Sequence, residues 1–436
     1  MKIRAKKRRN ILKFFAFDPG PTISQNYPKP IFNMGKNGKF GKDYGKVVGK
    51  DSKNRPGWKG PGYVKKAEPA AKAKPISAER SDAVTEPLLS IELQQLLLNI
   101  FRDTFPEVLN SDTLQPLLQT VKSALYERDF ARAFGQEDRL EAYSIRWSPS
   151  RALGYASILI NLRKHLAGLK LESKAVGEKG SSQVSANITL HAVCFGGGAA
   201  EVVAFGGFLR FFRGSAPSSQ DAGEDESAAV EVLSSLTVSD IAAINLLLID
   251  TAEWKTVADK LHQGLVTPPA LSKYASASAR EANLSLIPAS AMTTVFRSED
   301  VLQLSQGQIS DIIGKSPILL TLLFTLNELY TTSIGKTTAF LLNLTTAAKP
   351  GTLLLVVDSP GSYSETTVGV GAKKYPMKWL LDHTLLETEK TQGEESLASW
   401  EKVISEDSQW FRLPDGLRYP IPLENMRYQV HLYRRL

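Results

Sequence analysis

The chain of 436 residues contains very little cysteine and histidine: one cysteine, Cys194, and five histidines. A single cysteine excludes an intrachain disulfide and any cysteine-rich zinc site. The histidines are scattered without the spacing of metal ligands, so we expect no metal centre. Cys194 lies inside an apolar run, which favours a small buried side chain over a catalytic thiolate.

Long apolar runs are missing as well. No run reaches the roughly 18 residues that a helix across a bilayer requires. The apolar segment 11–17 is too short for the hydrophobic region of a secretory signal. We therefore expect a soluble intracellular protein with no membrane partner.

Acidic residues are scarce in the first 80 positions, which hold 5 Asp+Glu against 21 Lys+Arg, whereas the remainder holds 40 acidic and 32 basic residues. A basic arm on an acidic body favours binding to a polyanion, and RNA or DNA is the expected partner. A solubilising or nuclear-import tail explains the opening MKIRAKKRRN equally well. The Lys-, Gly- and Pro-rich composition predicts a disordered arm over residues 1–80.

After the arm, apolar residues recur with the period of a helix. The pattern predicts helices over 91–101 and 114–121, and another over 151–169 after a turn at Ser148-Pro149-Ser150. We interpret residues 81–186 as a helical cap beside an α/β body, with a loop at 177–183.

The body, residues 187–436, alternates apolar runs with helical stretches, as a buried parallel sheet requires. Five runs are predicted strands: 188–195, 243–250, 284–288, 318–324 and 352–358. Two alternating runs, 409–413 and 426–433, follow as a terminal β pair, and the polar segment 215–227 is an inserted loop. The pattern predicts a Rossmann-like α/β fold.

Two features indicate a nucleotide-type cofactor. Three glycines, Gly196, Gly197 and Gly198, separate the first strand from a helix, so the backbone can turn sharply and approach a ligand at the helix N-terminus. Asp250 ends the second strand, where a carboxylate can accept hydrogen bonds from both hydroxyls of a ribose. A packing corner and a helix N-cap are the structural alternatives.

Further candidates follow along the chain. Thr251 adjoins Asp250, and Trp254 could pack on an adenosine or in the core. Asp300 offers an acceptor for an adenine amine and Val301 an apolar wall, although a solvated loop acid fits Asp300 equally well.

Three polar side chains follow the fourth strand, Asn327, Glu328 and Tyr330, at the carboxyl edge of the predicted sheet. Glu328 could instead be a simple acid at a helix start. Arg146, Trp147 and Arg151 could contact RNA or form a structural turn.

Five segments carry a family resemblance: CFGGGAAEV, LLLIDTAEW, FTLNELYT, VVDSPGSYSE and ENMRYQVHLYRRL. They resemble the fungal 25S ribosomal RNA uridine-N3 methyltransferase family over about residues 88–436. The resemblance implies a class I S-adenosylmethionine (SAM) enzyme, with a seven-stranded, mostly parallel sheet, a terminal antiparallel β pair and an N-terminal helical cap. It also implies that the glycines, Asp250, Thr251, Asp300 and Val301 bind the cofactor.

The resemblance further implies a ribosomal RNA or pre-60S partner and a nuclear or nucleolar location, with the cytoplasm as a second possibility. The sequence shows no strong self-association signal, so we expect a monomer. Many class I enzymes carry an acid at the end of the first strand, whereas this chain has Cys194 and Phe195 there, and Glu201 lies beyond the glycines. The contacts to the methionine part of the cofactor are therefore left open.

The implied reaction requires loss of the N3 proton of uracil while the base is held in line with the methyl group. We expect Glu328 to act as the base, Asn327 to bind a uracil carbonyl, and Tyr330 or Phe324 to lie against the ring. Three alternatives stay open: a methyltransferase of another RNA, a protein or a small molecule; a non-catalytic ribosome-assembly factor; and an NAD-dependent oxidoreductase, although the glycine run lacks G-x-G-x-x-G spacing.

Overall fold

The computed structural model describes residues 89–169, 188–214, 241–360, 365–368, 373–386 and 399–436, which fall within one compact unit. The basic arm at 1–80 and the loops expected at 177–183 and 215–227 lie outside the described residues.

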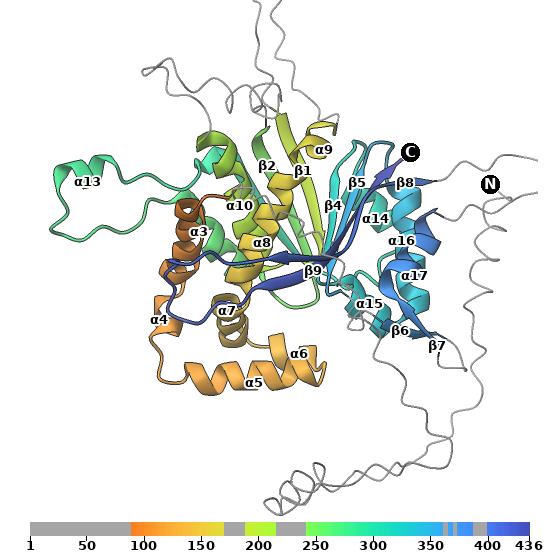
Figure 1. Cartoon of the computed structure of the whole chain (residues 1–436), viewed down its shortest axis with the longest axis horizontal. Helices are drawn as coiled ribbons and strands as arrows, with labels where there is room; N and C mark the ends of the chain where they lie inside the picture. Colours follow the sequence, from red (N-terminus) through yellow and green to blue (C-terminus); the bar gives the residue numbers. More distant parts are fainter. Residues whose placement is uncertain (1–88, 170–187, 215–240, 361–364, 369–372, 387–398) are drawn as a thin grey trace, which may run out of the picture. The chain divides into compact units, whose positions relative to one another are not determined.

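A seven-stranded sheet in the order β3-β2-β1-β4-β5-β9-β8 forms the centre of the described structure (Figure 1). Its first five strands are parallel, β9 is antiparallel to β5, and β8 is antiparallel to β9. This confirms the expected α/β fold with a terminal antiparallel pair. The strands are β1 (Ile188–Phe195), β2 (Ile241–Asp250), β3 (Met292–Ser298), β4 (Leu319–Leu323), β5 (Leu353–Asp358), β8 (Trp400–Phe411) and β9 (Met426–Arg435). A separate two-stranded sheet pairs β6 (Glu365–Val368) with β7 (Lys373–Pro376).

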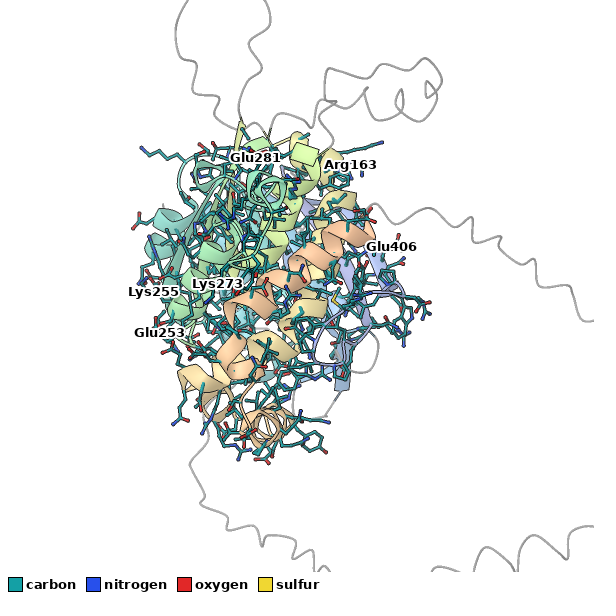
Figure 2. The ribbon with its side chains drawn as sticks, turned by 90° about the vertical axis from the view of Figure 1, so that its left-hand side faces the viewer. Arg163, Glu253, Lys255, Lys273, Glu281 and Glu406 are labelled. Carbon is teal, nitrogen blue, oxygen red and sulfur yellow. The ribbon has the colours of Figure 1, made fainter. Side chains whose placement is uncertain are left out.

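Helices cover both faces of the large sheet, and an apolar core lies under each cover. One core joins the sheet to helices α3, α5, α7, α8, α10 and α12, and the other joins it to α14, α15, α16 and α17 (Figure 1). Viewed from the side, α3 crosses the outside of the first helix layer (Figure 2). The principal helices are α3 (Ile91–Thr104), α5 (Leu114–Tyr126), α7 (Glu137–Arg146), α8 (Ser148–Asn161), α10 (Ala199–Gly214), α12 (Lys255–Val266), α14 (Gln306–Ile313), α15 (Leu326–Thr332), α16 (Ile334–Ala347) and α17 (Met377–Leu386).

Shorter helices complete the chain: α4 (Pro106–Leu109), α6 (Phe130–Phe134), α9 (Arg163–Ala167), α13 (Ala277–Glu281) and the 3-10 turn η1 (Ala289–Ala291). No helix among the described residues is long and apolar enough to cross a membrane.

The inner parallel strands match the prediction because they are buried on both faces. β1 has the expected bounds, and β2, β4 and β5 agree to within two residues. The third strand was expected at 284–288, which is wrong, since β3 is Met292–Ser298. Among the described strands β3 pairs only with β2. After the buried Met292 it alternates half-buried with exposed residues, so it lacks the continuous apolar run of an inner strand.

The last edge strand also differs from the prediction. The run at 409–413 overlaps only the end of β8, which spans Trp400–Phe411 and carries several exposed charged residues. Its pairing with β9 shifts register twice. An irregular, charged edge strand of this kind avoids pairing with other chains but shows no clear alternation in sequence.

The helix expected over 151–169 begins earlier and is divided. α8 starts at Ser148 with Pro149 in its first turn, a position that proline favours because no hydrogen bond is lost there. It is buried along most of its length and packs against α10. α8 is therefore part of the helix layer on the sheet, whereas the division into a cap at 81–186 and a core at 187–436 stays a prediction.

Candidate active site

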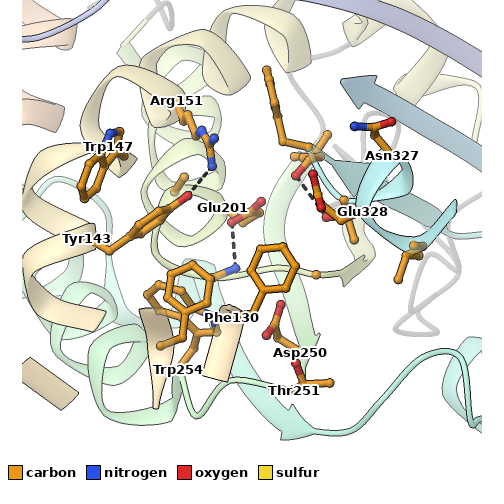
Figure 3. A pocket seen from close by; sticks show the side chains of 18 of the residues that line it. Phe130, Tyr143, Trp147, Arg151, Glu201, Asp250, Thr251, Trp254, Asn327 and Glu328 are labelled. Atoms are coloured by element: carbon orange, nitrogen blue, oxygen red, sulfur yellow. Dashed lines mark hydrogen bonds between the residues drawn. The ribbon is translucent and has the colours of Figure 1, made fainter. Parts of the chain in front are cut away.

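A cavity of about 630 Å³ lies at the carboxyl edge of the parallel strands, bounded by the ends of β1, β2, β4 and β5 and by helices α6 to α8 (Figure 3). This is the edge at which open α/β sheets bind ligands. The volume is within the range of small-molecule and cofactor sites.

The glycine corner forms one wall of the cavity. Gly196 has a φ of +74°, and a Cβ there would overlap the side chain of Thr325. A Cβ on Gly198 would lie 3.1 Å from the ring of Trp254. Both glycines line the cavity, whereas Gly197 is buried behind them against Cys194. The corner therefore serves tight packing and close approach to a ligand at once.

Cys194 is itself fully buried, and burial raises the pKa of its thiol far above the ordinary range. This agrees with the expected structural role. No group of three or more His, Cys, Asp or Glu side chains in the described part of the chain is arranged to hold a metal ion.

Glu201 projects into the cavity from the first turn of α10 (Figure 3). Its Oε2 accepts a hydrogen bond from the Gly198 backbone N–H at 2.8 Å, and the residue is only 5% exposed. Burial raises the pKa of Glu201 to about 7, against the opposing effects of the Gly198 hydrogen bond and of Arg151. The three-residue spacing from Gly198 is that of a capping box, which is the sequence signal that could have placed this acid here.

Asp250 ends β2 as expected and lines the cavity. Its Oδ1 accepts a hydrogen bond from the Ala252 backbone N–H at 2.7 Å, and the side chain of Trp254 also hydrogen-bonds the carboxylate. Burial raises the pKa of Asp250 to about 6, which these hydrogen bonds oppose. Asp250 therefore both holds the turn after β2 and faces the cavity, beside the exposed Thr251.

The segment after β3 is divided between the cavity and the core. Asp300 is exposed and lines the cavity, and its Oδ1 accepts a hydrogen bond from the Leu302 backbone N–H at 2.9 Å. Val301, expected as an apolar wall, is instead buried in the core that contains α14 and does not line the cavity. Leu302 is the apolar cavity residue of this segment.

The three candidate residues after β4 do not all line the cavity. Asn327 and Glu328 line the cavity, and the Asn327 backbone N–H donates to Asp358 Oδ2 at 3.0 Å. Tyr330 is 1% exposed and packs in the core on the other side, outside the cavity. It follows Glu328 by two residues, about 200° around a helix. The contact expected between Tyr330 and the substrate stays a prediction, and this placement of Tyr330 does not support it.

Arg151 points into the cavity from α8 (Figure 3). Its guanidinium donates a hydrogen bond to the Tyr143 hydroxyl and lies 4.9 Å from the centroid of the Phe324 ring. It also interacts electrostatically with Glu201 and Asp358. The sequence offers the segment 146–151, RWSPSR, as a possible RNA contact. Its last residue, Arg151, lies within the cavity instead.

The other two candidate residues of the segment 146–151, Trp147 and Arg146, lie in different places. Trp147 lines the cavity, whereas Arg146 forms an ion pair with Glu424 outside it. Phe324 itself lines the cavity and has a φ of +56°, a left-handed conformation that is uncommon for a bulky residue.

An ion pair connects two sides of the cavity. Arg128, in the turn between α5 and α6, donates a hydrogen bond of 2.8 Å to Glu328 Oε2 on α15. Burial raises the pKa of Glu328, and the charge of Arg128 opposes this effect. No sequence pattern indicated Arg128, because its turn and α15 are adjacent only after folding.

Five carboxylates and two guanidiniums line the cavity: Glu201, Asp250, Asp300, Glu328 and Asp358, with Arg128 and Arg151. Asp358 accepts hydrogen bonds from the backbone N–H groups of Asn327 and Ser359, at 3.0 Å and 2.8 Å, and burial raises its pKa to about 6. An excess of carboxylates attracts a cationic ligand and repels the diphosphate of a dinucleotide. These residues therefore suit a sulfonium cofactor better than NAD.

The sheet order, the glycine corner and the acidic cavity define a Rossmann-like protein with a site for a nucleoside cofactor. Residues 101–434 match a family of SAM-dependent methyltransferases. The chain is also 33% identical over 350 residues to the 25S rRNA (uridine(2843)-N(3))-methyltransferase of Saccharomyces cerevisiae, covering 78% of this chain and 85% of the relative. The chain belongs to this family of SAM-dependent methyltransferases.

Solved structures show weaker similarity. Human N-acetylserotonin methyltransferase in complex with SAM aligns with a TM-score of 0.28 and 12% identity, over 78% of this chain and 66% of that one. The N-methyltransferase NodS of Bradyrhizobium japonicum aligns with a TM-score of 0.27 and 10% identity, over 65% and 96%. At these scores neither alignment carries an argument, and the fold rests on the strand order above.

Proposed function

We propose that this protein transfers a methyl group from SAM to N3 of a uridine in large-subunit ribosomal RNA. The name of the yeast relative supports the uridine and the atom. The observation that carries the proposal is a carboxylate with a raised pKa, Glu328, in a cavity whose other carboxylates suit a cationic cofactor.

The chain's residues suggest how the cofactor is held. Gly196 and Gly198 would allow its close approach, and Asp250 with Thr251 would bind the ribose. Asp300 would accept a hydrogen bond from the adenine amine. Gly197 and Val301 are excluded from this proposal because they do not line the cavity.

The methionine end is assigned to a separate set of residues. Arg151 would bind the carboxylate, because it is one of two cations among the described lining residues and the other is paired with Glu328. Glu201 and Asp358 would bind the ammonium group. When bound, SAM supplies a methyl group that the sulfonium charge already activates.

The remaining task of the protein is to remove a proton from the uracil. N3 carries a hydrogen, and its lone pair is available for bond formation only after that proton leaves. Glu328 would accept the proton, and Asn327 would donate a hydrogen bond to an adjacent carbonyl. Phe324, rather than Tyr330, would lie against the ring, because Phe324 lines the cavity.

The target uridine must be unpaired when it enters, since N3 is enclosed in a Watson–Crick pair. Phe130, at the cavity and partly exposed, offers an aromatic surface for an extruded base. The substrate would therefore be a single-stranded or opened site in the RNA.

The test is methylation of large-subunit rRNA isolated from cells that lack this protein. We expect the purified protein with SAM to restore one N3-methyluridine, measured by mass spectrometry of nucleosides. Asp250→Ala, which removes the expected ribose contact, is the inactive control. Methylation of another nucleoside, or of protein only, would contradict the uridine assignment while leaving the cofactor assignment intact.

We also propose that the partner is ribosomal RNA within a pre-60S particle or free of it, and that the protein acts as a monomer in the nucleus or nucleolus. The basic composition of residues 1–80 supports a nuclear location. A fluorescent fusion lacking residues 1–15, compared with the full chain, tests the location. Sedimentation of the purified protein tests the oligomeric state.

A further inference from the structure

The β8–β9 hairpin exposes an aromatic side chain between two arginines. Trp410, near the end of β8, is 49% exposed. The guanidinium of Arg412 lies 5.0 Å from the centroid of its ring and that of Arg427 lies 5.7 Å away. We call Trp410, Arg412 and Arg427 the Trp410 cluster.

The hairpin has a buried side and an exposed side. Phe411 and Met426 pack against Gly154 of α8 on the buried side. Side chains alternate across a strand, so Trp410 and Arg427, which are register partners, project away from α8. The exposure of Trp410 thus follows from the strand geometry, with its neighbours anchored in the core.

The loop at the end of the hairpin is fixed to the helices. The Tyr419 hydroxyl donates to the Ile145 carbonyl at 2.9 Å, and Gln95 exchanges hydrogen bonds of 2.8 and 2.9 Å with the Arg418 backbone. Within the cluster, Arg427 Nε donates to Ser408 Oγ at 3.1 Å. The cluster is therefore held in place before any partner binds, which reduces the entropy lost on binding.

None of the acidic side chains that the structure describes neutralises the two guanidiniums. Within the part of the chain that the structure describes, no carboxylate forms an ion pair with Arg412 or Arg427. The nearby acid on β8, Asp407, is paired with Lys378 at 2.5 Å. Both guanidiniums lie over the Trp410 ring, so a base that stacks on this ring would displace one guanidinium, which can then bind a flanking phosphate.

The cluster lies at the same edge of the sheet as the cavity. Gln429 of β9 is the register partner of Asp358, which lines the cavity, and Arg427 lies two residues beyond Gln429. Two strand residues span about 7 Å. A nucleic acid that delivers one base to the cavity can therefore continue along this edge.

We infer that the Trp410 cluster is an RNA-binding surface, which stacks an unpaired base on Trp410 and binds flanking phosphates through Arg412 and Arg427. This inference rests on the proposed function, because it assumes an RNA substrate. Single-stranded RNA fits better than duplex, since an exposed base face is needed for stacking.

The experiment measures binding of the full-length protein to a fluorescent 30-nucleotide single-stranded RNA of mixed sequence and to its duplex. We expect Trp410→Ala to weaken single-strand binding about tenfold, and Trp410→Phe to retain most of it. Arg412→Gln with Arg427→Gln should also reduce the salt dependence of binding. SAM affinity, measured by calorimetry, should be unchanged in all three.

The matched control is Tyr274→Ala with Arg280→Gln, an exposed aromatic and an exposed arginine around α13. Lys273 and Glu281, which flank that segment, lie apart from Glu406 of β8 in Figure 2. The control should bind both RNAs as the wild type does. Equal RNA binding by wild type and Trp410→Ala, or equal losses in cluster and control variants, would overturn the inference.

The outcomes separate this inference from the proposed function. If the wild type forms no N3-methyluridine in rRNA but Trp410→Ala weakens RNA binding, the uridine assignment fails and the RNA surface stands. If the wild type methylates rRNA and the Trp410 variants bind RNA normally, the surface fails alone. The inference would also be overturned if a protein partner bound the Trp410 cluster and RNA did not compete with that partner for binding.

Discussion

Arg128 donates a 2.8 Å hydrogen bond to Glu328 although 200 residues separate them in the sequence. The pair joins the turn after α5 to the helix after β4, across the cavity in which we place the target base. Both side chains are partly exposed, so the pair contributes little to stability. Its consequence is electrostatic, because the charge of Arg128 opposes the rise in the pKa of Glu328 that burial causes.

Replacing Glu328 with Gln tests its role as the base. The amide cannot accept the N3 proton, so we expect kcat to fall by roughly 100- to 10,000-fold, the usual effect of general base catalysis. SAM affinity by calorimetry should stay nearly the same. Glu281→Gln, an exposed acid on α13, is the control and should be fully active. A loss of SAM binding in Glu328→Gln would instead assign Glu328 to the cofactor.

Replacing Arg128 with Gln tests the electrostatic effect of the pair. Arg128 lowers the pKa of Glu328, so its removal should raise that pKa. A base works only when deprotonated. The acid limb of the pH profile of kcat/KM should therefore move to higher pH. At alkaline pH, kcat/KM of the variant should come close to the wild-type plateau. Arg128→Lys keeps the charge and should leave the limb near its wild-type position. An unmoved limb in Arg128→Gln would contradict the pairing as a functional interaction.

The sequence predicted the inner strands and the glycine corner because both depend on local properties. Buried parallel strands are continuous apolar runs, and the turn after β1 needs glycine at Gly196. The strands β3 and β8 were misplaced because they lie at the two edges of the described sheet, where more side chains are exposed and the continuous apolar signal is lost.

The candidate site was less predictable because it depends on tertiary contacts. Asp250 ends a strand and Glu328 follows one, so both could be found by position in the chain. Arg128 reaches the cavity from the turn after α5 and Arg151 from α8, and only packing against the sheet brings them there. The helical turn after Glu328 directs Tyr330 to the opposite face, which its place after the strand does not indicate.

Replacing Gly196 with Ala tests why the glycine is required. Gly314 offers a comparison, since its φ of +75° is positive like that of Gly196, at +74°, but nothing lies within 4 Å of a Cβ there. The ψ of Gly314 is −153°, a conformation that residues other than glycine rarely adopt, so Gly314→Ala should cost about 1–3 kcal/mol of unfolding free energy from backbone strain alone. Gly196→Ala should cost more, because its methyl group overlaps Thr325, and it should also weaken SAM binding. Denaturant unfolding and calorimetry measure the two effects, and equal losses of stability would contradict the role of Thr325.

The raised pKa values of the cavity acids predict how stability depends on pH. Glu201 has a pKa of about 7 in the folded protein, and Asp250 and Asp358 have values of about 6, all above their ordinary values. The folded state therefore holds protons that the unfolded state has lost. This contribution to stability is complete below about pH 4 and is lost as the pH rises to about 7. Glu201→Gln keeps the hydrogen bond to Gly198 but removes one titration, so its unfolding free energy should decline less between pH 5 and 8 than that of the wild type.

The same protons should leave when the cationic cofactor binds. A positive sulfonium and ammonium beside these carboxylates favour their ionised forms, so SAM binding near pH 6.5 should release protons to the buffer. Calorimetry in two buffers of different ionisation enthalpy measures the number released. Glu201→Gln should release fewer protons than the wild type, and Glu281→Gln should release the same number. Proton uptake on binding, or a release that Glu201→Gln leaves unchanged, would show that the cofactor's positive charge lies elsewhere than beside Glu201.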